Sequence, residues 1–206
     1  KNMQGLVSWW KVEGNANDEI DGNNGFLLSG ASITSNGKFG NAVFLDGIDD
    51  YVSVFDNANL RPNQFTISAW INDRNITTSY GSVIDKADPA VIQGYFLRLW
   101  GTPEFVVILN GANVYPVYAN GRIEPNKWYH IVGTYNGTNM NLYLNGQLNN
   151  SGSANYTPST NVLYIRYSDI NSPQSYFNGT IDEVMIFNRS LSANDVAALY
   201  NMDLSN

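Results

Sequence analysis

Acidic side chains in three distant segments are the first residues of this sequence whose types suit them to chemistry. They are Asp18 in a polar loop, Asp46 in the run LDGIDDY and Asp182 inside an otherwise apolar run. Carboxylates that meet without a lysine or arginine nearby repel one another and raise one another's pKa, unless a cation binds between them. Calcium suits such a group because it accepts several oxygen ligands with loose geometry. If these segments meet, they form a calcium site.

The same acidic residues also have ordinary structural roles open to them. Asp46 and Asp49 are suited to Asx turns, and Asp182 can accept hydrogen bonds from backbone N–H groups. The local spacing does not fit an EF-hand. Other acidic residues compete as ligands, namely Glu13, Asp21 and Glu183. From the residues alone, a metal site and these structural roles both stay open.

A second group of candidate residues comes from strand alternation. In FTISAWIN, Ile67 and Ile71 fall on one face, so Trp70 points to the other. Applied to the runs at 95–100, 127–135 and 162–167, the alternation predicts one shared outer face that carries Trp70, Phe96, Arg98, Trp100, His130, Tyr164 and Arg166. Sugar C–H faces stack on aromatic rings while hydroxyls bond to planar donors, so such a face suits carbohydrate. The expected glycan contacts are Trp70, Phe96, Arg98, Trp100, Tyr164 and Arg166.

Two other interpretations of this aromatic face remain. Loops at residues 88–94 or 102–103 can fold over the sheet and turn the face into a second core. An exposed aromatic patch on a sheet can also contact a protein. The assignment depends on strand register, because a slip of one residue exchanges the two faces of a strand.

Short predicted strands separated by glycine and asparagine turns position these side chains. Alternation predicts strands at 6–12, 26–28, 42–45, 51–55, 65–72, 82–85, 95–100, 105–110, 114–119, 127–135, 140–144, 162–167 and 180–187. Ser192 and Asp195 form an approximate capping box, which predicts a short helix at the C-terminal end. With no repeat and no linker, the pattern predicts one all-β domain over residues 1–206, folded as a two-sheet antiparallel sandwich.

Several segments together resemble a known family. They are LVSWWKVEGNANDEIDGNNG, GKFGNAVFLDGIDDYVSV, FTISAWI, NKWYHIVGTYNGTNMNLYLNG and GTIDEVMIFNRSLSANDVAALY, in this order. In this order they resemble the laminin-G-like, concanavalin A-like jelly-roll domains of secreted bacterial and archaeal proteins, in the concanavalin A-like lectin/glucanase superfamily. The resemblance implies a jelly roll whose first and last strands lie side by side. It also implies a structural calcium, held by Asp18, Asp46 and Asp182 with a carbonyl such as that of Gly47.

The resemblance also raises the possibility of catalysis, which we weigh against the residues. Glycoside hydrolases of the same sandwich carry a Glu-x-Asp-x-(x)-Glu run on one strand, and no such run occurs here. Asp182 and Glu183 are neighbours on a predicted strand, so we expect them to point to opposite faces. The one histidine, His130, is expected to make a hydrogen bond within the sheet. We therefore do not expect an enzyme.

Composition narrows the partners. The net charge of −7 and the pI near 4.5 argue against nucleic acid and anionic membrane surfaces. No apolar run is long enough to span a bilayer. Cysteine is absent, which excludes disulfides and thiol catalysis. Six Asn-X-Ser/Thr sequences permit an extracellular location.

Together these observations predict a non-catalytic recognition module with a structural calcium. We expect it to bind carbohydrate outside the cell or at the cell surface, as part of a larger secreted protein with other domains. The alternative is a structural or adhesive module that binds protein or spaces other domains, and a glycoside hydrolase comes third.

Overall fold

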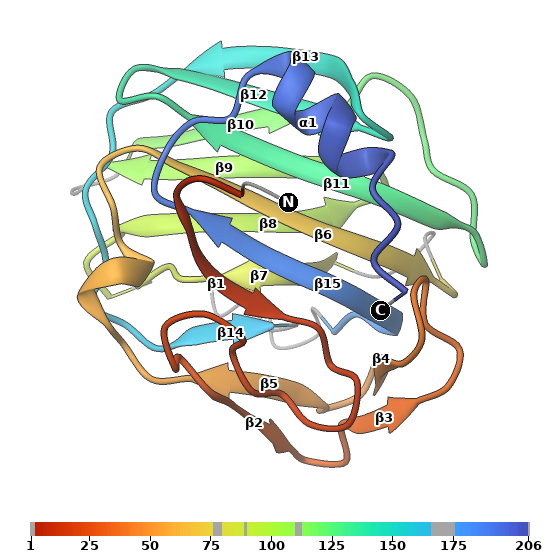
Figure 1. Cartoon of the computed structure of the whole chain (residues 1–206). Helices are drawn as coiled ribbons and strands as arrows, with labels where there is room; N and C mark the ends of the chain where they lie inside the picture. The colour runs from red at the N-terminus through yellow and green to blue at the C-terminus, as the bar shows by residue number, and fades with distance from the viewer. Residues whose placement is uncertain (1–2, 76–79, 89, 110–112, 166–175, 206) are drawn as a thin grey trace.

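The described residues of the computed structural model form two antiparallel sheets packed face to face (Figure 1). They comprise residues 3–75, 80–88, 90–109, 113–165 and 176–205. The eight-stranded sheet contains β1 (Leu6–Trp10), β3 (Ser32–Thr34), β4 (Ala42–Asp46), β6 (Phe65–Asp73), β11 (Trp128–Tyr135), β12 (Asn139–Leu144), β13 (Gln147–Ser153) and β15 (Asn178–Phe187). The seven-stranded sheet contains β2 (Gly25–Leu28), β5 (Tyr51–Val54), β7 (Tyr80–Asp85), β8 (Gly94–Trp100), β9 (Pro103–Leu109), β10 (Asn113–Tyr118) and β14 (Leu163–Ile165).

Two short helical segments complete the described secondary structure. A 3-10 turn, η1 (Ala58–Leu60), follows β5, and α1 (Ala193–Tyr200) follows β15. The predicted all-β two-sheet sandwich with one short C-terminal helix is confirmed. No helix in the described residues is long and apolar enough to cross a membrane.

The main core lies between the two sheets and is built by strand alternation. Ile67 and Ile71 of β6 face Leu97 of β8 and Phe105 of β9 within one buried apolar cluster. Gly133 of β11 is required where the sheets approach, because a Cβ there would lie 2.5 Å from Cδ2 of Phe105. The period-two pattern of the sequence therefore identified the inward side chains of β6 and β8 correctly.

A second apolar cluster lies on the other side of the eight-stranded sheet, beneath α1. Val196 and Leu199 of the helix pack against Val132 of β11 and Met185 of β15. Ser192 caps the helix as predicted, since its side chain accepts from the Asp195 N–H while the Asp195 carboxylate accepts from the Ser192 N–H. Figure 1 shows α1 in front of this sheet. The middle of the eight-stranded sheet is therefore covered on both faces.

Strand β15 is central to the eight-stranded sheet and contains a β-bulge. It pairs with β6 and β4, and also with β1, so the first and last strands are adjacent as predicted. The register with β6 shifts between Asp182 and Met185, and Glu183 has a φ of 51°. The prediction that Asp182 and Glu183 point to opposite faces is therefore wrong, because the extra residue of a bulge breaks the alternation. Both carboxyls lie on the outer side, as their contacts below show.

Candidate functional site

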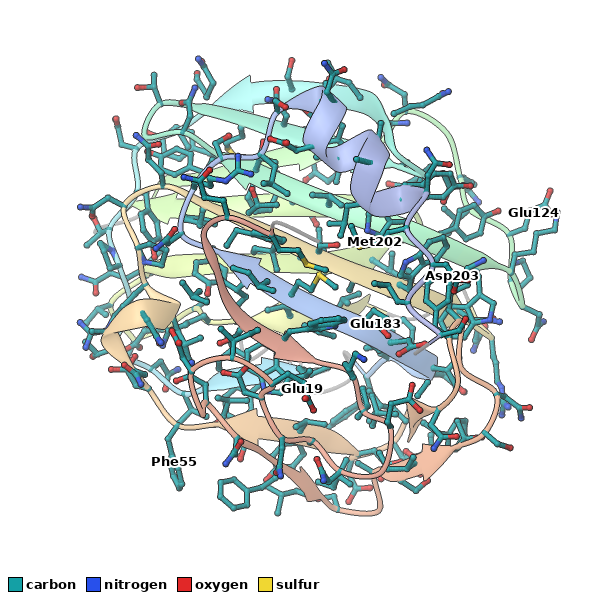
Figure 2. The ribbon with its side chains drawn as sticks, viewed as in Figure 1. Glu19, Phe55, Glu124, Glu183, Met202 and Asp203 are labelled. Carbon is teal, nitrogen blue, oxygen red and sulfur yellow. The ribbon has the colours of Figure 1, made fainter. Side chains whose placement is uncertain are left out.

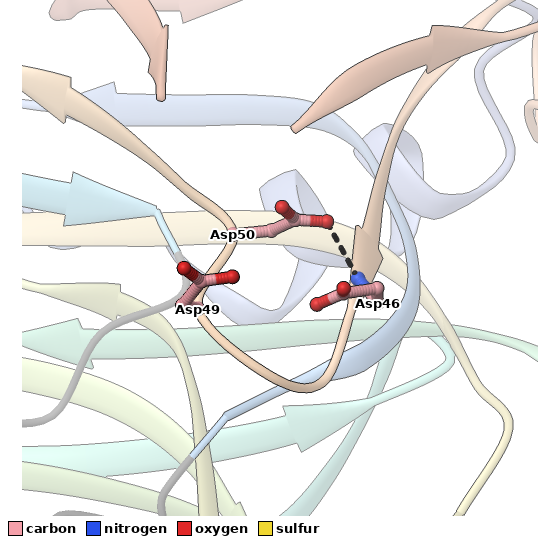
Figure 3. A group of neighbouring side chains, drawn as sticks. All are labelled: Asp46, Asp49 and Asp50. Atoms are coloured by element: carbon pink, nitrogen blue, oxygen red, sulfur yellow. Dashed lines mark hydrogen bonds between the residues drawn. The ribbon is translucent and has the colours of Figure 1, made fainter. Parts of the chain in front are cut away.

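The turn between β4 and β5 gathers three carboxylates. Asp46, Asp49 and Asp50 each offer an oxygen that lies within 4.8 Å of the others (Figure 3). Asp50 Oδ2 accepts from the Asp46 N–H at 2.9 Å, and Asp46 Oδ1 accepts from the Ile48 N–H at 2.7 Å. Gly47 has a φ of 81°, which this turn needs and which glycine adopts without strain. Because β4 and β5 belong to different sheets, the turn also joins the two layers.

This acidic turn can hold a metal ion. Among the described residues, Asp46, Asp49 and Asp50 are the acidic or histidine side chains that form a group of three with ligand atoms close enough together to share one ion. Asp50 is buried and Asp49 is exposed, so the oxygens span a boundary between protein and solvent. Oxygen ligands at a surface turn suit a hard cation such as calcium. Asp46 and Gly47 were predicted from the LDGIDDY run, which also contains Asp49 and Asp50.

Asp18 has a different role from the one that the resemblance implied. Its buried carboxylate accepts hydrogen bonds from its own loop and from β1, with donors Ser8 Oγ, Trp9 N, Ile20 N, Asp21 N and Asn23 N. These bonds fix the loop that follows β1. The structure does not bring Asp18 into a group with Asp46.

Asp182 is also occupied elsewhere. Its Oδ2 accepts from the N–H groups of Lys38 and Phe39 at 2.8 and 3.0 Å, while Oδ1 is buried without a hydrogen-bond partner in the described residues. Burial raises the pKa of Asp182 to about 7. The predicted convergence of Asp18, Asp46 and Asp182 is therefore corrected. The strands do meet, but β1 pairs with β15 only from Val184 onward, beyond Asp182.

Glu183 lies beside Asp182 and is equally buried. Its Oε2 accepts from Trp9 Nε1, and its Oε1 has no hydrogen-bond partner among the described residues. Burial is the largest cause that raises the pKa of Glu183 to about 8, and the nearby Asp182 raises it further. Near these residues, a groove of about 530 Å³ lies between β1 and the C-terminal tail, lined by Met3, Leu6, Trp9, Lys11, Ile20, Asp203 and Leu204. Figure 2 shows Glu183 and Asp203 on this side of the molecule.

Trp70 lies on the outer face of its strand as predicted, but its predicted exposure is wrong. Only 4% of the residue is exposed, because the C-terminal helix and a loop cover it. The Tyr200 ring stacks on it with centroids 5.5 Å apart, and Lys38 Nζ lies 4.4 Å from its ring centroid. His130 is buried beside it and bonds to Ser68 Oγ at 2.8 Å, and burial lowers the pKa of His130 to about 3. Trp70 and His130 are parts of a covered, structural cluster.

The predicted single aromatic face is in fact divided between the two sheets. Trp70 and His130 belong to β6 and β11 of the eight-stranded sheet, whereas Phe96 and Arg98 belong to β8 and Tyr164 to β14 of the seven-stranded sheet. Alternation alone cannot assign a strand to a sheet, which explains the error. The Trp100 side chain and the whole of Arg166 lie outside the described residues.

The outer face of the seven-stranded sheet carries a polar row that crosses four strands. Cross-strand pairing aligns Ser82, Arg98, Glu104 and Tyr118 on β7, β8, β9 and β10. Arg98 Nε donates to Glu104 Oε2 at 2.6 Å. Glu104 Oε1 and Ser82 Oγ are buried without a hydrogen-bond partner in the described residues, whereas Tyr118 is 42% exposed. The row therefore offers one neutralised ion pair and a partly exposed phenol that interacts with Glu104.

Phe96 and Tyr164 share this outer face but differ in access. Phe96 is buried, because Ala87 and Ile92 of the loop before β8 pack over it, so its predicted exposure is wrong. The guanidinium of Arg98 lies 4.7 Å from the Phe96 ring centroid on the same side. Tyr164 is half-buried and makes an edge-to-face contact with Tyr51. The suggested loop cover at 88–94 therefore exists over part of the face.

Several residues of this face were not predicted from the sequence, namely Glu104, Tyr118, Tyr51, Phe26 and Phe55. Alternation on the runs at 51–55 and 114–119 was the signal that pointed to Tyr51 and Tyr118. Pairing Glu104 with Arg98 needs the β8–β9 register, which only the folded chain provides.

The sequence of this chain matches a known protein family. A family model of the laminin G group (Laminin_G_3), described as the concanavalin A-like lectin/glucanases superfamily, matches residues 46–197. The chain belongs to this family. The resemblance seen in the sequence is thereby confirmed, and the sandwich is a jelly roll of the concanavalin A-like type. A comparison with curated proteins finds no significant match.

Similar solved structures include toxin binding domains and a domain of an arabinanase. The binding domain of Paraclostridial Mosquitocidal Protein 1 aligns with a TM-score of 0.81 at 19% identity, over 96% of this chain and 52% of that one. Domain 4 of AbnA, an extracellular GH43 arabinanase from Geobacillus stearothermophilus, was solved in complex with arabinotriose. It aligns with a TM-score of 0.76 at 19% identity, over 95% of this chain and 98% of that one. The binding domain of botulinum neurotoxin DC in complex with rat synaptotagmin II aligns with a TM-score of 0.75 at 18% identity, over 96% of this chain and 51% of that one. The chain spans about half of the toxin domains but nearly all of the arabinanase domain.

Proposed function

We propose that this chain is a non-catalytic recognition module that binds carbohydrate outside the cell or at its surface. Its binding site is the outer face of the seven-stranded sheet, and calcium at the acidic turn stabilises the fold. The observation that carries the proposal is the row of Arg98, Glu104 and Tyr118, with Tyr164 on the same face.

The chemistry of this row suits sugar hydroxyls. A hydroxyl is both donor and acceptor, so it can donate to Glu104 Oε1 while accepting from Arg98. Arg98 is already paired with Glu104, so a neutral ligand meets no uncompensated charge. Tyr118 and Tyr164 add rings and hydroxyl groups of the kind that carbohydrate sites use. The solved arabinanase domain bound to arabinotriose supports the same class of ligand.

Calcium at the acidic turn is the second part of the proposal. Asp46, Asp49 and Asp50 supply the carboxylates, and the Gly47 carbonyl lies within the same turn. A calcium ion there compensates two of the three negative charges and ties β4 to β5 across the two sheets. Asp18 and Asp182 are left out of this ligand set, because neither belongs to the group of carboxylates that comes together at the turn.

Two observations support a non-catalytic role. Glu104 forms an ion pair with Arg98, and Asp182 and Glu183 are buried in the covered side of the eight-stranded sheet. Two of the similar solved structures reported above are themselves described as binding domains. Protein recognition is the second candidate function, because the neurotoxin domain bound to synaptotagmin shares this fold.

A glycan array with calcium present, followed by titration calorimetry, tests the proposal. We expect the wild type to bind a subset of glycans, and Tyr118→Ala and Arg98→Lys to weaken binding about tenfold or more, since Lys lacks the planar fork of Arg. Leu148→Ala is the matched control, because Leu148 is, like Tyr118, an exposed large side chain but lies on β13 of the other sheet. Absence of binding to every glycan, with a folded protein, would overturn the proposal in favour of protein recognition.

A further inference from the structure

An exposed aromatic cluster occupies one end of the outer face of the seven-stranded sheet. Phe26 is 49% exposed, Leu28 is 37% exposed and Phe55 is 70% exposed. Tyr51 and Tyr164 lie beside them and are half-buried. We call these five residues the edge cluster. Figure 2 shows Phe55 projecting from the molecule at the end opposite α1.

Strand geometry places four of the five side chains on the same side of the sheet, and the fifth, Phe55, contacts Phe26 there. Val52 and Val54 of β5 and Leu163 and Ile165 of β14 point into the main core, so Tyr51 and Tyr164 point outward. On β2, Leu27 packs on the same core, which turns Phe26 and Leu28 outward. The small side chain of Ser53 lies between Phe26 and Tyr164 in the cross-strand pairing. The cluster thus forms a surface on the same face as the polar row.

The rings of the edge cluster support one another rather than the core. Phe26 and Phe55 meet edge to face with centroids 5.5 Å apart, and Tyr51 and Tyr164 do so at 5.8 Å. Because the rings of each pair already pack against each other, a ligand that binds them orders few additional side chains. Phe55 lies outside the buried clusters of the protein, so stability does not require its ring. A contiguous exposed apolar surface of this kind indicates binding.

The electrostatics of the edge cluster select a neutral ligand. Its members carry rings, hydroxyls and an aliphatic side chain but no charge. The acidic turn is adjacent, because Asp50 precedes Tyr51 and a Cβ on Gly30 after β2 would lie 2.6 Å from Asp50 Oδ1, and one of its three negative charges remains when calcium is bound. The chain as a whole carries a net charge of −7. An acidic sugar is repelled here, whereas a neutral sugar can stack on the rings and bond to the tyrosine hydroxyls.

The edge cluster and the polar row lie too far apart for one sugar ring. The strand order is β10, β9, β8, β7, β14, β5, β2, so three strand spacings separate Glu104 on β9 from Tyr164 on β14. At about 4.8 Å per spacing, the component of the separation across the strands is already roughly 14 Å, and Phe26 on β2 lies further still. We propose that the face binds a neutral linear oligosaccharide that runs across the strands, with its polar end at the row and its far rings on the edge cluster. This inference rests on the proposed carbohydrate function and specifies its ligand.

Titration calorimetry with arabino-oligosaccharides and xylo-oligosaccharides, from monosaccharide to hexasaccharide, tests the inference in calcium buffer. We expect affinity to rise with chain length in at least one series. Phe55→Ala should lower affinity for the longest members about three- to tenfold, the loss of one stacked ring, and leave the shortest members unchanged. Leu148→Ala should change neither. Lactose should bind more tightly than sialyllactose.

The outcomes separate this inference from the proposed function. If glycans bind with an affinity independent of chain length, or if Phe55→Ala binds the longest members as tightly as wild type, the edge cluster is not a subsite and the proposed function stands. Tighter binding of sialyllactose than of lactose overturns the neutral selectivity in the same way. If no glycan binds at any length, the proposed function itself fails.

Discussion

The outer faces of the two sheets differ in what covers them. On the eight-stranded sheet, α1 and the loop at Lys38 enclose Trp70 together with an apolar cluster. On the seven-stranded sheet, no helix packs on the described part of the face, although Ile92 covers Phe96. Strand alternation places side chains on the outer faces of both sheets in the same way. The segment that packs over a face therefore decides whether that face is accessible to a ligand. An aromatic residue that points outward from a strand is a contact candidate only where no segment packs over it.

The buried carboxyls follow the same division. Asp182 and Glu183 lie on the covered face, where burial raises both pKa values. Glu104 lies on the other face and is paired with Arg98. On the covered face, Asp182 Oδ1 and Glu183 Oε1 therefore have no hydrogen-bond partner among the described residues. On the open face, Arg98 compensates the charge of Glu104. The predictions below test this contrast.

Truncation of Trp70 should have the largest effect, since it removes a ring enclosed by α1, His130 and Phe39. We expect Trp70→Ala to lower the free energy of unfolding by about 3–5 kcal/mol in urea denaturation. Tyr118→Ala, an exposed aromatic of the other face, should lose well under half as much. Equal losses from the two variants would mean that the two faces do not differ as described.

Calcium should stabilise the protein through the turn that joins the two sheets. At a free concentration a hundredfold above its Kd, it should add about 2.7 kcal/mol to the free energy of unfolding, and EDTA should remove this. Asp50→Asn should abolish the response in a thermal scan. Asp182→Asn and Asp88→Asn should keep it. A response lost in Asp182→Asn but kept in Asp50→Asn would restore the ligand set implied by the resemblance.

The buried pair should make stability depend on pH in an unusual direction. Because the folded pKa values of Asp182 and Glu183 are raised, to about 7 and about 8, the folded state binds more protons than the unfolded state. Their contribution is fully present below the unfolded values near 4 and is lost as the pH rises through 7 to 8. We expect each carboxyl to account for about 1 kcal/mol or more.

Urea denaturation between pH 5 and pH 9 checks this slope. Asp182→Asn keeps an acceptor for Lys38 and Phe39 but removes one titrating group, so it should flatten the loss of stability at high pH. Glu124→Gln, an exposed acid on a loop, should leave the slope unchanged. A slope identical in wild type and Asp182→Asn would show that Asp182 does not titrate in this range.

Truncation of Phe55 should have the smallest effect on stability. Its ring is mostly exposed and contacts Phe26 at the surface, so Phe55→Ala should change the free energy of unfolding by no more than about 0.5 kcal/mol. Thermal and urea unfolding measure this. A loss above 2 kcal/mol would make Phe55 a structural residue and remove the contrast with Trp70.

Much of the fold was determined by local sequence. Period-two alternation predicted the inward faces of β6, β8 and β14, and the residues Ser192 and Asp195 predicted the start of α1. The LDGIDDY run predicted an acidic turn at Asp46 and Gly47. These features depend on residues within a few positions of one another, because backbone geometry fixes side-chain direction and capping locally.

The tertiary structure decided the rest. Whether Trp70 shares a sheet with Arg98, whether Asp18 meets Asp182, and which face α1 covers all depend on pairing between segments far apart in the chain. The bulge at Glu183 was equally hidden, since one extra residue is visible only against the register of β6. Alternation states which side chains share a face of a strand, but it carries no information on which strand lies next or what packs above it.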